Sequence, residues 1–307
     1  MIIYGSGMAG MLTAHMLRRH KPIIKESQNA LPNNHDALLR FRSDKVSIAT
    51  GIPFKRVKVR KAIKYDSEII TEPNIFLSNM YSKKVTGAYY DRSINNLDPA
   101  IRYIAPFNFI ELMSNGLDIK YGETLDPYKL PSVGEDPIIS TIPMPVMMNI
   151  VNWKQKPDFK FKKIWSKRGV ISDPTMDIYQ TIYYPDKLSK CYRVSITGNI
   201  IIAEYIEEPD KKASELFSFL MEDFGIQPKT LNNLSLSEMK YGKLLPIDDT
   251  IRKEFILHMT QKYNIFSVGR FATWRQLLLD DVVDDINVVD NLIGNNYLIN
   301  LSSKKGI

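Results

Sequence analysis

The stretch that decides the fold reads Gly5-Ser6-Gly7-Met8-Ala9-Gly10, a complete G-x-G-x-x-G. An apolar stretch over residues 1–4 precedes it, and mostly helix-forming residues follow it over residues 11–18. A second short apolar stretch over 22–25 leads to Glu26. This order predicts a strand, a tight turn, a helix and a second strand, which together form a βαβ unit.

Each part of this unit has a physical role that points to a dinucleotide. Gly5 permits the tight turn out of the strand, Gly7 lets the backbone approach a pyrophosphate, and Gly10 lets the helix pack on the strand. The N-terminus of the helix offers unpaired N–H groups and a partial positive charge to phosphates. We therefore expect all six residues from Gly5 to Gly10 to bind a cofactor.

The acid at the end of the second strand narrows the choice of cofactor. Glu26 stands about 20 residues after the start of the glycine motif, where a carboxylate accepts hydrogen bonds from ribose hydroxyls. We expect Glu26 and its neighbour Ser27 to bind this ribose. An acid here favours an unphosphorylated adenosine ribose, as in FAD or NAD, over NADP.

A second informative stretch lies near the end of the chain, over residues 263–275. It predicts a short apolar strand that ends at Gly269-Arg270, followed by a helix that Asp280 or Asp281 can cap. Apolar residues recur along that helix at the spacing of one buried face, at positions Val282, Ile286, Val289 and Ile293.

This closing segment resembles that of the large FAD family that holds UDP-galactopyranose mutase, protoporphyrinogen oxidase and the amine oxidases. The resemblance implies FAD as the cofactor. It places Gly269 and Arg270 near the ribityl and pyrophosphate groups, and Asp281 and Val282 near the flavin ring. A helix N-terminus at that position would stabilise negative charge on reduced flavin.

Two further segments bear on the resemblance. Residues 136–143 are similar to the family's "strand then Thr-x-Pro" segment, which implies that Thr141 contacts the cofactor. The second glycine pair that mutases carry after the ribose acid is absent, which argues against mutase activity. Arg40 or Arg42 stands in that region instead, and we expect one of them to bind the pyrophosphate.

These observations predict an α/β fold, a Rossmann-type FAD-binding domain with an inserted α+β substrate domain. The length of 307 residues suits about two lobes. The predicted boundaries are 1–50, 135–150 and 240–307 for the cofactor domain, and 51–134 and 151–239 for the substrate domain.

The substrate-contacting residues are predicted from weaker signals. A polar and aromatic segment over 89–93, followed by Arg102 and Tyr103, is the first candidate to face the flavin. Tyr192 and Arg193 lie in a segment similar to a strand of the mutase-like substrate domain, with a ligand-free strand as the alternative. Trp274 is the last of the residues that we predict to contact the substrate. No catalytic base can be named from the sequence.

The net charge of +7 and the pI of about 9.1 fit an anionic ligand or nucleic acid, or a merely soluble surface. Basic residues gather over 52–64, as a solvated strand face or a phosphate patch. They gather again over 154–168, as a nucleotide-stacking segment or a lysine-guarded edge strand. The single cysteine and the short apolar runs favour a cytoplasmic protein without a membrane span, and we expect no metal.

The predicted function is that of an FAD-dependent oxidoreductase of amine oxidase-like type, in which the flavin carries the chemistry. Residues 41–44, 49–54 and 269–275 also look like flavin oxidoreductases of tailed bacteriophages. That resemblance implies oxidation of a C–N bond in an amine-bearing substrate, such as a hypermodified thymine nucleotide in phage DNA, in the host cytoplasm. The alternatives are a mutase-like isomerase that uses reduced FAD and a non-enzymatic FAD-stabilised binding protein.

Overall fold

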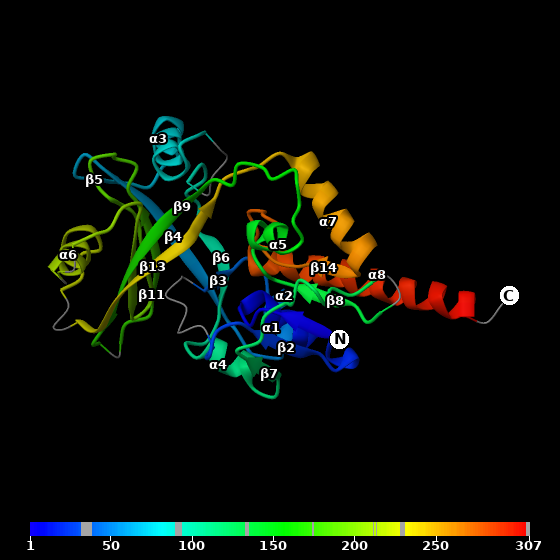
Figure 1. Cartoon of the computed structure of the whole chain (residues 1–307). Coiled ribbons are helices and arrows are strands. Elements are labelled where there is room, and N and C mark those ends of the chain that lie inside the picture. Colours follow the sequence, from blue (N-terminus) through cyan, green and yellow to red (C-terminus); the bar gives the residue numbers. More distant parts are fainter. Residues whose placement is uncertain are drawn as a thin grey trace.

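The structure is a computed structural model that describes residues 1–31, 39–89, 94–132, 135–173, 175–210, 212, 214–227 and 231–304, with side chains up to 294. Two β-sheets organise two lobes, and the chain passes between them several times (Figure 1). The first and last parts of the chain lie together in the lobe of the smaller sheet (Figure 1).

The smaller sheet has five strands in the order β14-β8-β1-β2-β7, and all of its pairs are parallel. Its members are β1 (Ile2–Tyr4), β2 (Ile23–Glu26), β7 (Asp118–Tyr121), β8 (Ile138–Ser140) and β14 (Ile265–Ser267). The predicted strands before the glycine motif, before Glu26 and before Gly269 are therefore confirmed.

Side chains of this sheet alternate between two helix layers, as the period of a strand requires. Ile3, Ile139 and Phe266 pack under the layer of α1 (Met8–Met16), α2 (Lys45–Thr50), α4 (Phe109–Ser114) and α8 (Leu279–Lys304). Tyr4 and Ile138 face the layer of α5 (Met144–Ile150) and α7 (Asp249–Tyr263). The predicted apolar stripe of the last helix is confirmed, because all four of its residues are buried in the first layer.

The larger sheet has nine strands in the order β13-β9-β12-β11-β10-β4-β6-β3, with β5 beside β4. The β10–β4 pair is parallel and the others are antiparallel. The strands are β3 (Arg40–Phe41), β4 (Lys55–Tyr65), β5 (Glu68–Ile70), β6 (Ala100–Ile104), β9 (Phe161–Ile171), β10 (Ile178–Tyr183), β11 (Cys191–Gly198), β12 (Ile200–Tyr205) and β13 (Leu231–Leu244).

Helices cover both faces of this sheet. The helix α3 (Ile75–Thr86) packs on one face through Leu77, Tyr81 and Val85. The helix α6 (Ser214–Ser218) and the π-turn η2 (Phe219–Asp223) cover the other face through Leu216 and Leu220. In the lobe of the smaller sheet, the 3-10 turn η1 (Arg18–His20) follows α1 and precedes β2.

Both basic segments lie in the larger sheet. In β4, Val57 and Val59 are buried while Arg56, Lys58 and Arg60 are exposed, so the predicted one-sided strand is confirmed. The alternative of an edge strand for the second segment is wrong, because β9 lies between β12 and β13.

The sheet membership differs from the predicted boundaries at the end of β13, whose residues 240–244 belong to the larger sheet beside β9, and at β7 and β3. The strand β7 lies in the 51–134 segment that we assigned to the substrate domain, yet it pairs with β2 in the smaller sheet. The short strand β3 lies in the 1–50 segment, yet it pairs with β6 in the larger sheet. Both pairings join residues far apart in the sequence, so local pattern does not report them. Among the described residues, no helix combines the length and the apolar character that a membrane crossing needs.

Candidate cofactor site

The turn between β1 and α1 needs glycine at two positions. Gly5 has a φ of +102°, and a Cβ there would lie 2.2 Å from Thr141 Oγ1. A Cβ on Gly10 would lie 1.9 Å from the carbonyl oxygen of Gly5. These contacts press the strand, the turn and the helix together, as expected for this motif.

Gly7 differs, because nothing in the protein requires it. It is the N-cap residue of α1 with an extended conformation (φ −63°, ψ 172°), and a Cβ there would meet no atom within 4 Å. It lines a cavity instead. No side chain caps α1 and no acid lies in its first turn, so the positive end of the helix stays available to a ligand.

Glu26 is buried at the end of β2 and is held by four donors. Its Oε2 accepts hydrogen bonds from the backbone N–H and the hydroxyl of Ser6, at 2.7 and 2.8 Å. Its Oε1 accepts bonds from Gln28 N at 3.0 Å and Ser27 Oγ at 3.2 Å. Burial raises the pKa of Glu26, but these hydrogen bonds outweigh it, so the pKa is lowered and the group stays ionised.

The loop after β14 forms the opposite wall. Gly269 has a φ of +91°, and a Cβ on it would lie 2.7 Å from Ala9 Cβ, so this loop touches the start of α1. Next to it, Arg270 donates from Nη2 to Gly242 O at 3.0 Å, whereas its buried Nε has no partner. Burial lowers the pKa of Arg270. A buried cation with an unpaired donor beside a cavity suits an anionic group.

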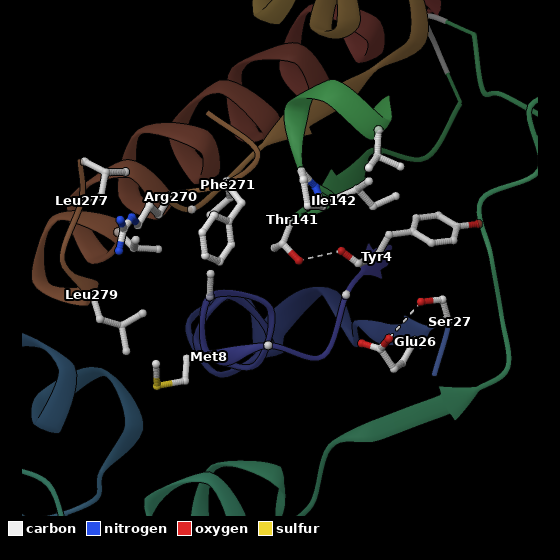
Figure 2. A pocket seen from close by; sticks show the side chains of 18 of the residues that line it. Tyr4, Met8, Glu26, Ser27, Thr141, Ile142, Arg270, Phe271, Leu277 and Leu279 are labelled. Carbon is white, nitrogen blue, oxygen red and sulfur yellow. Dashed lines mark hydrogen bonds between the residues drawn. The ribbon is translucent and has the colours of Figure 1, made fainter. Parts of the chain in front are cut away.

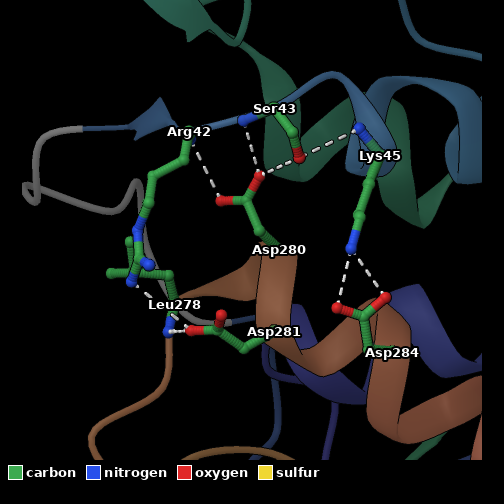
Figure 3. A network of polar contacts seen from close by, with 7 residues as sticks. All are labelled: Arg42, Ser43, Lys45, Leu278, Asp280, Asp281 and Asp284. Carbon is green, nitrogen blue, oxygen red and sulfur yellow. Dashed lines mark hydrogen bonds and ion pairs between the residues drawn. The ribbon is translucent and has the colours of Figure 1, made fainter. Parts of the chain in front are cut away.

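The N-terminus of α8 is fixed by a polar network (Figure 3). Asp281 Oδ2 accepts a hydrogen bond from Leu278 N at 2.7 Å, so Asp281 caps the first turn. Asp280 turns away and accepts bonds from Arg42 N, Ser43 N and Ser43 Oγ, at 3.2, 2.9 and 2.6 Å. Arg42 is held beside Asp281 at 3.6 Å, not at the cavity.

These elements enclose one cavity of about 760 Å³. In Figure 2, Glu26 and Ser27 lie at one end, and Arg270, Leu277 and Leu279 lie at the other. It is lined by eleven of the fourteen predicted cofactor residues: Gly5, Gly7, Met8, Ala9, Glu26, Ser27, Arg40, Thr141, Gly269, Arg270 and Val282.

The other three predicted cofactor residues support the lining rather than form it. Ser6 is buried behind Glu26, Gly10 packs on Gly5, and Asp281 caps α8. Thr141 is fixed at the wall, because its Oγ1 donates to Tyr4 O at 2.8 Å (Figure 2).

Sequence reasoning missed much of the apolar wall and the segment after β7. The predicted residues Met8 and Val282 line the cavity. The lining also includes several residues that we did not predict: Leu39, Ile110, Thr124, Leu125, Ile142, Val146, Phe271 and Leu279. Thr124 and Leu125 follow β7, so assigning that strand to the smaller sheet would have located them.

Arg40 lines the cavity but its guanidinium points into the larger sheet. It donates to Thr197 Oγ1 at 2.9 Å, to Thr181 Oγ1 at 2.7 Å, and to two backbone carbonyls of β10 and β11. Burial, with the nearby Arg193, lowers the pKa of Arg40 to about 9, so it remains protonated at neutral pH. The expected contact with pyrophosphate therefore gains no support from this geometry.

The predicted substrate residues do not line the cavity. Tyr192 is fully buried and donates to Glu204 Oε1 at 2.9 Å, and Arg193 pairs with the other oxygen of Glu204. A bulge at this point of β11 lets two successive residues reach one partner. Trp274 is also buried, and its Nε1 donates to Leu245 O at 3.1 Å.

Arg102 and Tyr103 lie on β6, and Arg102 donates to the backbone of Ile101. Residues 90–93 of the predicted polar and aromatic segment lie outside the described residues. In the part of the chain that the structure describes, no group of three or more His, Cys, Asp or Glu side chains is arranged to hold a metal ion.

The chain is similar in structure to solved proteins of three different names. Reduced UDP-galactopyranose mutase matches 95% of this chain and 93% of its own, with a TM-score of 0.64 and 13% identity. An Exiguobacterium protein provisionally described as a protoporphyrinogen oxidase matches 96% and 98%, with a TM-score of 0.59 and 10% identity. The p-nitrophenol 4-monooxygenase of Pseudomonas putida matches 96% and 80%, with a TM-score of 0.53 and 11% identity.

These similarities establish the fold: a Rossmann-type α/β unit with a second sheet, as found in FAD-dependent oxidoreductases. The predicted fold class is confirmed. No protein-family model matches the sequence. No curated protein matches it either. Since one fold carries an isomerase and a monooxygenase, the reaction of this chain has to be argued from its own residues.

Proposed function

We propose that the chain is an FAD-dependent oxidoreductase. The observation that carries the proposal is the continuous cavity from Glu26, past Gly7 and the start of α1, to Arg270 and the start of α8. An elongated dinucleotide needs a ribose acceptor, an uncapped helix end and a second positive wall in that order. The free Nε of Arg270 and the open space at Gly7 fit such a ligand.

Different residues of the cavity would bind different parts of FAD. Glu26 would accept the hydrogen bonds of the adenosine ribose, and the backbone at Gly7 and Met8 would approach the pyrophosphate. Arg270 would offer Nε to the flavin half of the cofactor. The apolar lining of Phe271, Leu279 and its neighbours would exclude water from the ring.

When bound, FAD would supply the redox chemistry for removing a hydride from a substrate C–H beside nitrogen or oxygen, with dioxygen or another acceptor reoxidising it. The protein orients and shields this step. The N-terminus of α8 lies at the cavity through Leu279 and Val282, and its partial positive charge stabilises negative charge that develops there. The Asp280 contacts to Arg42 and Ser43 hold this helix end in place.

The finer part of the proposal is the substrate, an amine whose C–N bond is oxidised. It is supported by the sequence resemblance of residues 41–44, 49–54 and 269–275 to flavin oxidoreductases of tailed bacteriophages. An aminated thymine nucleotide, free or within DNA, is the substrate that this resemblance favours. The basic exposed face of β4 supports it too, because phosphates are held by such faces.

The first test is the visible spectrum of the purified protein, with the released cofactor identified by mass. Gly7→Ala should lose most of the flavin, because the added methyl group has room in the protein but not against a pyrophosphate. Gly294→Ala is the matched control, since a Cβ there also meets no atom within 4 Å and Gly294 does not line the cavity.

Equal flavin content in both variants would contradict the assignment of the motif. A colourless protein that binds NAD but not FAD would contradict the cofactor. Anaerobic bleaching by an aminated nucleotide would support C–N oxidation, whereas turnover only after reduction by dithionite would point to the mutase-like alternative.

A further inference from the structure

The two faces of the larger sheet differ in chemistry. Toward α6, the inner strands present Ile182, Val194, Ile201 and Ala203, which form an apolar core. The opposite face carries buried polar and charged side chains on the same strands, among them Thr181, Ser195, Ser166 and Glu204. Burying polar groups is unfavourable unless they are paired, so a polar buried face calls for an explanation.

The strand register places these side chains in two adjacent rows. One row crosses the sheet through Thr181, Ser195, Ile202, Arg168 and Ser235. The next row crosses it through Tyr183, Arg193, Glu204, Ser166 and Ser237. Residues of one strand two positions apart share a face, so both rows lie on the same side. The helix α3 covers this side at Tyr183.

Two buried donors in these rows have no hydrogen-bond partner: Arg168 Nη2 and Ser237 Oγ. They lie on neighbouring strands, because Arg168 is paired with Ser235 and Ser166 with Ser237. This makes Arg168 and Ser237 diagonal neighbours, about 7–8 Å apart at the backbone and within reach of an arginine side chain. The Phe107 ring lies 4.8 Å from the Arg168 guanidinium and holds it from the other side.

Positive charge exceeds negative charge around these donors. The guanidinium of Arg40 bonds to Thr181 and Thr197 on this face, and Arg193 and Arg168 stand in the two rows. The carboxylate of Glu204 is already engaged by Arg193 and Tyr192. Burial and the like charge of Arg193 lower the pKa of Arg40, which an anion would reverse.

We propose that Arg168 and Ser237 form a binding site for the phosphate group of the substrate. A phosphate offers several strong acceptor oxygens, which match a guanidinium and a hydroxyl that lack partners. Arg40 joins this site to the cofactor cavity, because it lines the cavity and bonds to Thr181 in the first row. A phosphorylated substrate anchored here would extend its reacting end toward the flavin. The inference rests on the proposed function for that direction, but not for the anion site itself.

The test is titration of the purified full-length protein with thymidine 5′-monophosphate, with inorganic phosphate, and with thymidine as the phosphate-free probe. Arg168→Gln should weaken binding of the monophosphate by about tenfold or more, because a charge-assisted hydrogen bond is lost. Ser237→Ala should weaken it by about threefold. Arg19→Gln is the matched control, since Arg19 is an exposed arginine of the other lobe that does not line the cavity. Arg60→Gln separately tests the exposed basic face of β4.

Flavin absorbance is recorded for every variant, so the two proposals fail separately. If the protein contains no flavin and still binds phosphate through Arg168, the phosphate site is supported and the proposal of FAD as the cofactor is contradicted. A flavin-loaded protein in which Arg168→Gln and Arg19→Gln bind the monophosphate equally well would overturn the site. Failure of the wild type to bind either phosphate probe at millimolar concentration would also overturn it. So would DNA binding that Arg60→Gln weakens and Arg168→Gln leaves unchanged, with no monophosphate bound.

Discussion

The two sheets of this molecule are held together by different means. In the five-stranded sheet, backbone approaches backbone at Gly5 and Gly10, and at Gly269 the loop reaches the start of α1. In the nine-stranded sheet, the buried carboxylate of Glu204 is ion-paired with the half-buried Arg193 of the neighbouring strand. Added atoms at the glycines should therefore destabilise the smaller sheet, whereas removal of a charge should destabilise the larger sheet. The difference leads to predictions in which the two sheets respond to opposite kinds of substitution.

The largest effect is expected from adding a methyl group at Gly10. In Gly10→Ala the Cβ would lie 1.9 Å from Gly5 O, and a backbone carbonyl cannot move aside without distorting the turn. We expect the free energy of unfolding to fall by about 3 kcal/mol, measured by chemical denaturation. Gly294→Ala, at an open position inside α8, should leave stability unchanged or raise it by up to about 1 kcal/mol. Equal stability of the two variants would mean that the turn is not closed by this contact.

Removing a charge from the larger sheet should have a comparable effect. Glu204→Gln leaves the half-buried Arg193 without its anion, and we expect a loss of about 3 kcal/mol. Glu238→Gln removes the partner of Lys163 in an exposed pair and should cost less than about 0.5 kcal/mol. Similar losses in both variants would show that burial does not distinguish the two ion pairs.

The ion pair of Glu204 with Arg193 predicts that the free energy of unfolding depends on pH. Burial raises the pKa of Glu204, but the charge of Arg193 and the hydrogen bonds outweigh it, so the pKa is lowered on folding. The stability that Glu204 contributes is therefore present above its unfolded pKa of about 4.3 and is lost as the pH falls through the folded pKa. Wild type should lose stability below that pH more steeply than Glu204→Gln.

The smallest effect concerns the helix that closes the cavity. Asp280→Ala leaves two N–H groups of the 42–43 backbone without an acceptor, and we expect a loss of about 2 kcal/mol. Asp284→Ala, four residues further along α8, removes only the exposed ion pair with Lys45 and should cost less than about 0.5 kcal/mol. Flavin affinity measured in parallel should fall for Asp280→Ala alone, because only that change frees the N-terminus of α8 (Figure 3).

The sequence was sufficient where function depends on neighbouring residues. The glycine motif predicted β1, α1 and β2, and the Gly269-Arg270 stretch predicted the start of the closing helix, because tight turns and helix ends need particular residues at fixed spacing. Eleven of the predicted cofactor residues therefore line one cavity. Their binding of FAD stays a prediction.

The sequence was insufficient where pairing joins distant segments. The strand β7 pairs with β2, and this pairing brings Leu125 to the cavity. The residues of β7 alone do not indicate which strand it pairs with. Tyr192 and Trp274 are polar-tipped aromatic residues that read equally well as substrate contacts, yet both are buried with their polar atoms paired. Arg168 and Ser237 became a candidate site only through the register of β9 with β13.

The contact of Gly269 with Ala9 has a consequence for how the protein is made. The ribosome synthesises the glycine motif before the loop at Gly269 that contacts it. About 260 residues lie between the two segments in the sequence. At about 5–20 residues per second, the first half of the cavity waits on the order of tens of seconds for the second. Until β14 joins the sheet beside β8, the nascent chain has no closed compartment for a cofactor. Loading with flavin would thus follow the synthesis of β14.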